Sequence, residues 1–129
     1  MAYPPDKKSR PRHLYLTSAR LPLPALVSIL HRVSGFLLFL AIPLMLFVLQ
    51  TSLESAQQFH WIMSMLAHPV VKLLIWMLLL AGIHHFFAGL RHLAMNMQWG
   101  HGLVQAKSSS KLVLLLDLVL ATWGSLLLW

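Results

Sequence analysis

The sequence predicts an all-α membrane protein with three transmembrane helices. Of its 129 residues, 58% are apolar and only 10% are charged, whereas about a quarter of the residues of an ordinary soluble domain are charged. The apolar residues gather in three long stretches, and the basic residues lie at the ends of these stretches. The length allows one small domain. These observations together favour a helical bundle in a bilayer.

Each apolar stretch is long enough to cross a bilayer, whose core of about 30 Å requires roughly 20 helical residues. We expect helices over about residues 24–50, 69–93 and 111–129. They form a transmembrane domain over residues 23–129, which follows a basic leader over residues 1–22. The first stretch is interpreted as a retained helix, because it follows this polar leader and is too long for the apolar region of a signal peptide. Residues 108–110, all serine, are expected to form a turn before the third helix.

The basic residues predict the orientation of the helices. Five Lys or Arg side chains precede the first helix, whereas the connection over residues 51–68 contains Glu54 and no Lys or Arg. Because basic residues are enriched in cytoplasmic loops, the N-terminus should be cytoplasmic and the C-terminus periplasmic. Lys107 and Lys111 agree with this topology. Lys72 is the exception, and its long side chain can reach outward to the interface.

Two classes of function are excluded by composition. The chain has no cysteine, so it cannot form a disulfide or hold an iron–sulfur cluster through its own thiolates, and any metal must have nitrogen or oxygen ligands. The net charge of +7 does not indicate a nucleic-acid partner, because the cations flank membrane spans rather than gathering on one soluble face.

The first group of polar residues inside an apolar helix lies in the run SILHRVSG. Ser28, His31, Arg32 and Gly35 follow a spacing that places them on one helical face. A hydroxyl and a guanidinium one turn apart could donate hydrogen bonds to the oxygens of a quinone. The alternative is that Arg32 extends to lipid phosphates while His31 lies in the headgroup layer.

The second group lies in the run IHHFFAGLRHL, where His85, Gly89 and His92 share one face. A buried imidazole with a glycine one turn away suits the axial ligand of a b-type haem. His84 points about 100° away, and an error of one residue in register would exchange its role with that of His85. The alternative is that these histidines only form hydrogen bonds between helices.

A haem with two histidine ligands would need its second imidazole from another polypeptide, because only His85 is well placed in this chain. Its propionates would be met by cations at the cytoplasmic edge of the bundle. Four residues are candidates for this contact: His31, Arg32, Arg91 and His92.

Asp117 is the only charged residue inside the third apolar stretch. It lies about 9 Å from Lys111 along the helix axis, at a rise of about 1.5 Å per residue. We expect Asp117 to pair with such a cation at the cytoplasmic edge, with proton uptake as the alternative.

These motifs resemble the cytochrome b556 membrane-anchor subunits of succinate dehydrogenase, respiratory complex II. The resemblance rests on an Arg-Pro leader at residues 10–12, the Ser28 to Gly35 run, the His85 to His92 run and three helices of suitable length. It implies that His85 is an axial ligand of haem b, shared with a histidine of a second membrane-anchor subunit. It also implies that Ser28 and Arg32 help to form the ubiquinone site. It implies that His31 and Arg32 lie near the haem propionates, with Arg91 and His92 as further candidates for this position.

The resemblance further implies a bacterial inner-membrane complex in which a flavoprotein subunit carries FAD and an iron–sulfur subunit carries the clusters. This chain would anchor both subunits and would have no complete active site or catalytic residue of its own. Family members often have an acid where this chain has Asn96, so a role for an acid there does not carry over. Two alternatives remain: an anchor of a fumarate reductase, and a haem-free small membrane accessory subunit.

Overall fold

All the regular secondary structure in the described part of the chain is helical, with no strand. The computed structural model describes residues 21–100 and 102–128. It contains four helices: α1 (Leu23–Glu54), α2 (Ala56–Leu66), α3 (Pro69–Asn96) and α4 (Leu103–Leu128). By length and composition α1, α3 and α4 can each cross a membrane. This confirms the predicted class, an all-α membrane protein with three long apolar helices. Most of the leader predicted over residues 1–22 lies outside the described residues.

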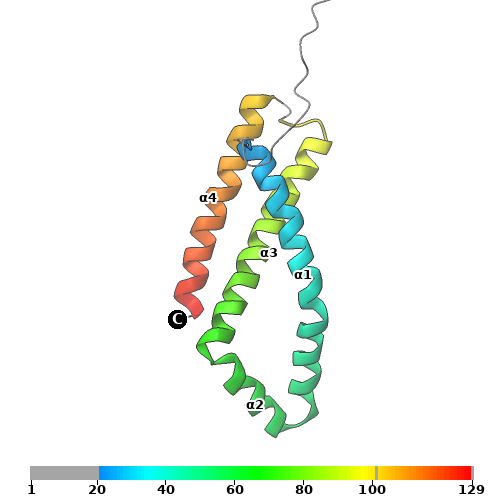
Figure 1. Ribbon diagram of the computed structural model, residues 1–129, viewed down its shortest axis with the longest axis vertical. Helices are drawn as coiled ribbons and strands as arrows, with labels where there is room; N and C mark the ends of the chain where they lie inside the picture. The colour runs from blue at the N-terminus through cyan, green and yellow to red at the C-terminus, as the bar shows by residue number, and fades with distance from the viewer. Residues whose placement is uncertain (1–20, 101, 129) are drawn as a thin grey trace, which may run out of the picture.

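The three long helices run side by side, and α2 joins α1 to α3 at one end of the bundle (Figure 1). At the opposite end α1 begins, α3 ends and α4 begins, and we call this the α3–α4 end. α3 packs against both α1 and α4. Near the other end of the bundle, the indole N–H of Trp76 donates to the carbonyl of Ala121 at 3.3 Å. α3 is therefore the central helix of this chain.

Local chemistry explains where the helices begin. Proline occupies the first turn of both α1 and α3, where its missing N–H costs no intrahelical hydrogen bond. Nδ1 of His68 accepts the N–H of Val70 at 3.3 Å before α3. Ser55 has an extended backbone between α1 and α2, and its hydroxyl accepts the N–H of Gln58 at 3.2 Å. These contacts satisfy N–H groups that have no partner within their own helix.

The sequence does not predict helix α2. It predicts only a connection between two spans over residues 51–68. This helix has 11 residues, too few to span a bilayer, so a search for long apolar stretches does not detect it. Ile62 is only 1% exposed, whereas Phe59 and Trp61 lie on the surface. α2 is thus an amphipathic segment that closes one end of the bundle.

The predicted serine turn before the third span is wrong. α4 begins at Leu103 rather than near residue 111, and residues 108–110 lie inside it. The hydroxyls of Ser109 and Ser110 donate to the carbonyl of Ala106 at 3.2 and 2.7 Å. Bonds of this kind within the preceding turn allow serine to remain helical.

The buried core is small and lies where α1, α3 and α4 meet. Val27, Ala88 and Val113 form its centre, with Phe87 and Leu114 packed against them. Small residues at such crossings are typical of membrane helices, because they let the backbones approach closely. Most large apolar side chains remain exposed on this chain, as expected for a surface that faces lipid or another membrane subunit.

Candidate functional site

Helix α3 presents two polar faces to its two neighbours. His84, Ala88 and Arg91 form one buried stripe, and polar atoms of His84 and Arg91 bond to residues of α4. His85 lies on another face and contacts His31 of α1. The adjacent histidines therefore have separate environments, as a helical rotation of about 100° per residue requires.

His85 is held by the backbone of α1. Its Nδ1 lies 3.1 Å from the carbonyl oxygen of His31 and 3.4 Å from the hydroxyl of Ser34. The rings of His85 and His31 are stacked, with centroids 4.2 Å apart and planes inclined by 10°. A carbonyl acceptor at Nδ1 favours the tautomer in which Nδ1 carries the proton, leaving the Nε2 lone pair available. Within the described residues, Nε2 of His85 makes no hydrogen bond.

Two glycines make room for these imidazoles. A Cβ added to Gly35 would lie 2.8 Å from Cε1 of His85, closer than real Cβ contacts allow. A Cβ added to Gly89 would lie 3.3 Å from Nε2 of His31. An imidazole oriented through Nδ1, with an available Nε2 and a glycine beside it, fits the donor that a b-type haem requires.

His84 is bonded through both of its ring nitrogens. Nδ1 lies 2.6 Å from Oδ2 of Asp117 in α4, and Nε2 lies 3.3 Å from the carbonyl of Val27 in α1. Both side chains are buried, and Oδ1 of Asp117 has no hydrogen-bond partner among the described residues. In this arrangement neither nitrogen of His84 is available to a metal.

The expected pairing of Asp117 with Lys111 is wrong. α4 turns the carboxylate inward toward α3, while Lys111 lies exposed on its surface. The partner is His84, which lies 33 residues away in the sequence. Spacing along one helix cannot reveal such a contact, because it depends on how α3 and α4 are rotated against each other.

Three of the predicted residues come together at the α3–α4 end of the bundle. The ring of His31 lies between those of His85 and His92, with the His92 centroid 5.1 Å away. Arg32 is exposed beside this group, and Ser28 is half-buried one turn earlier on α1. The structure thus gathers His31, His85 and His92, and leaves Arg32 exposed next to them.

Arg91 does not join this group, although it was a candidate for the same contact. Its Nε donates to the hydroxyl of Ser109 at 3.0 Å, and its Nη2 donates to the carbonyl of Ala106 at 3.4 Å. Both acceptors belong to α4. The spacing in the sequence indicates that Arg91 points toward α4 with His84, because the two residues are seven apart and therefore share one helical face.

Ser34 lies within the SILHRVSG run, but no role is predicted for it from the sequence. Its hydroxyl donates to the carbonyl of His31 at 2.9 Å and lies near Nδ1 of His85. Its position three residues after His31, directly before Gly35, places it on the same side of α1. This spacing could have identified it.

Comparison with known proteins shows the family to which this chain belongs. The sequence model of the succinate dehydrogenase/fumarate reductase transmembrane subunits matches residues 6–124. The chain is 36% identical over 121 residues to the succinate dehydrogenase cytochrome b556 subunit of Coxiella burnetii. The aligned residues cover 93% of this chain and 97% of the relative. It is 32% identical over 120 residues to the protein of the same name from Paracoccus denitrificans, covering 90% and 89% of the two chains. This chain therefore belongs to the family of succinate dehydrogenase/fumarate reductase transmembrane subunits.

Proposed function

We propose that this chain is the cytochrome b anchor subunit of a succinate:ubiquinone oxidoreductase in a bacterial inner membrane. It binds haem b together with a second membrane-anchor subunit and forms part of the site of ubiquinone reduction. FAD and the iron–sulfur clusters belong to the flavoprotein and iron–sulfur subunits. The observation that carries this proposal is the geometry of His85, whose Nδ1 is bonded to the His31 carbonyl beside Gly35.

The residues of this chain divide the binding of haem between them. His85 would supply one nitrogen ligand to the haem iron, and the second anchor subunit would supply another. His31, Arg32 and His92 lie where cations can meet the propionates. The side chain of Arg91 bonds to α4 instead, so we do not propose that it contacts a propionate. When bound, haem supplies a one-electron redox centre between the two anchors.

Ser28 and Arg32 supply donors for the quinone. They lie one turn apart on α1 near the α3–α4 end, and Arg32 is exposed. Reduction of ubiquinone consumes two electrons, which arrive through the iron–sulfur subunit, and two protons. Donors placed at a quinone carbonyl orient it and stabilise the negative charge that develops on its oxygen. The proposed orientation puts this end of the bundle at the cytoplasm, where those subunits dock.

The family includes anchors of both succinate dehydrogenases and fumarate reductases. The two relatives described above carry the succinate dehydrogenase name, and this favours succinate oxidation over the reverse reaction.

The quinone assignment is tested with Ser28→Ala and Arg32→Leu in the whole complex. We expect Arg32→Leu to lower ubiquinone reduction by about tenfold or more, since hydrogen bonds that involve a charged group contribute about 1.5–3 kcal/mol. Ser28→Ala should lower it by a smaller factor, since a neutral hydrogen bond contributes about 0.5–1.5 kcal/mol. Oxidation of succinate by a soluble artificial acceptor should remain. Ser52→Ala is the control, because among the described residues that hydroxyl bonds only to the Leu49 carbonyl, near the far end of α1. Equal loss of both activities, or no loss of quinone reduction, would contradict the assignment.

A further inference from the structure

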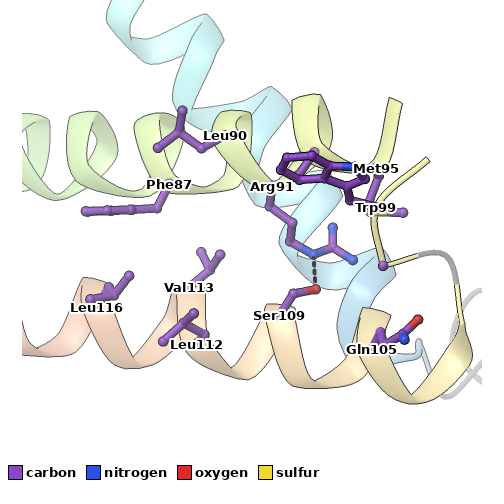
Figure 2. A pocket seen from close by; sticks show the side chains of 12 residues that line it. Phe87, Leu90, Arg91, Met95, Trp99, Gln105, Ser109, Leu112, Val113 and Leu116 are labelled. Carbon is purple, nitrogen blue, oxygen red and sulfur yellow. Dashed lines mark hydrogen bonds between the residues drawn. The ribbon is translucent and has the colours of Figure 1, made fainter. Parts of the chain in front are cut away.

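A cavity of about 390 Å³ lies between α3 and α4, at the end where the two helices are joined (Figure 2). Its walls are apolar side chains from both helices, including Phe87, Leu90, Leu112 and Leu116. Trp99 and Gln105 also line it near the connection between the helices. None of the residues assigned above to haem or quinone lines this cavity, so it is a separate feature of the chain.

Arg91 places a cation in this apolar cavity. The residue is 7% exposed, and Figure 2 shows its side chain extending from α3 toward Ser109 of α4. Its two hydrogen bonds use two of the five N–H donors of a guanidinium. In the described part of the chain, no carboxylate lies within salt-bridge distance of Arg91. A buried charge without a counter-ion is unfavourable, so this site favours an anion.

The surroundings of Arg91 indicate what kind of anion fits. The guanidinium lies near the end of a spanning helix, beside a tryptophan, and both residue types are typical of the headgroup layer of a bilayer. From there the apolar walls continue along α3 and α4 through Phe87 and Leu116. A ligand that matches both parts has an anionic head and a hydrocarbon tail. The volume is at the small end of ligand sites, which suits part of one acyl chain.

We propose that this cavity binds an anionic phospholipid, with its phosphate on Arg91 and one acyl chain between α3 and α4. Planar guanidinium groups bind phosphate oxygens through paired, charge-assisted hydrogen bonds. The hydroxyl of Ser109 accepts from Nε, and the carbonyl of Ala106 accepts one N–H of Nη2. The other N–H of Nη2 and both of Nη1 are left for the phosphate. Bound there, the lipid neutralises Arg91 and fills the space between the two helices.

The test uses the purified whole complex, delipidated in detergent and titrated with phosphatidylglycerol while native mass spectrometry counts bound lipids. Arg91→Gln should weaken one binding event by about tenfold or more, as loss of a charge-assisted contact implies. Lys107→Gln is the control, because it removes one exposed cation from the same end of α4 without touching the cavity. The same loss in both variants, or in neither, would overturn the proposal.

A second pair of variants tests the place of the acyl chain and leaves Arg91 intact. Leu112 and Leu115 are 55% and 56% exposed on α4, but only Leu112 lines the cavity. Leu112→Trp should therefore reduce the binding of phosphatidylglycerol, while Leu115→Trp should not. Equal effects of the two changes would contradict a lipid between the helices.

Two further titrations identify the chemistry that is recognised. Phosphatidylcholine, which is neutral overall, should bind this site more weakly than phosphatidylglycerol, and equal binding would overturn the role of charge. Millimolar inorganic phosphate should not displace the lipid, because it has no chain to occupy the apolar part. Displacement by phosphate alone would show a plain anion site and contradict the proposal.

Discussion

Nδ1 of His84 lies 2.6 Å from Oδ2 of Asp117, so a buried hydrogen bond joins α3 to α4 inside the bundle. This contact fixes the rotation of α3 about its own axis. Because Nδ1 of His84 is directed toward α4, the next residue, His85, is directed toward α1. There the His31 carbonyl accepts a hydrogen bond from Nδ1 of His85. The pair therefore helps to decide which of two adjacent histidines can serve as a ligand.

Removing the carboxylate should destabilise the bundle. Asp117→Leu leaves Nδ1 of His84 buried without a partner, which costs about 1–3 kcal/mol, and we expect the complex to lose its helical circular dichroism at a lower temperature. Asp117→Asn keeps an acceptor at this position and should have a smaller effect. Thr122→Val is the control, because the exposed hydroxyl of Thr122 bonds, within the described ranges, only to the Leu118 carbonyl of α4. Unchanged melting of Asp117→Leu would show that the pair contributes nothing.

The close approach at Gly35 should be essential for haem binding. Gly35→Ala places a methyl group 2.8 Å from Cε1 of His85, so the imidazole must move, and we expect the haem content of the purified complex to fall. Gly82→Ala is matched to it, because the added methyl group meets its nearest neighbour, Cδ2 of Leu38, at an ordinary 4.0 Å. Full haem content in Gly35→Ala would disprove the proposed position of the ligand.

The sequence predicts the class of fold and which residues share one polar face of α3. Helical spacing places His85, Gly89 and His92 together, and the structure brings this face to His31. α2 was missed because it is short, and the serine turn was wrong because serine hydroxyls can bond within a helix. The partner of Asp117 could not be predicted, since it depends on the relative rotation of two helices. Periodicity alone cannot supply that angle.

Arg32 and Arg91, both near the α3–α4 end, should affect the haem differently. Arg32 is exposed beside His31, whereas Arg91 bonds to Ser109 of α4. Removing a cation near haem disfavours the reduced form, because reduction adds a negative charge. Arg32→Gln should therefore lower the midpoint potential of the haem, measured by redox titration, more than Arg91→Gln does. A larger shift in Arg91→Gln would place the propionates on the α4 side.

The distribution of basic residues predicts that the C-terminus is periplasmic. Alkaline phosphatase is active only outside the cytoplasm, so its fusion to the C-terminus should be active, and the matching fusion to a fluorescent protein that folds only in the cytoplasm should be dark. Insertion of the same reporters after Gly100, between α3 and α4, should give the reverse pattern. The opposite result at both positions would invert the proposed topology.

The central claim is that His85, and not its neighbour His84, binds haem. The most direct test is a reduced-minus-oxidised visible spectrum of the purified complex, comparing the wild type with His85→Ala and His84→Ala. We expect the wild type to show the α-band of a low-spin b-type haem, His85→Ala to lose it, and His84→Ala to retain it. A wild type without the band, or loss of the band in His84→Ala alone, would contradict this account.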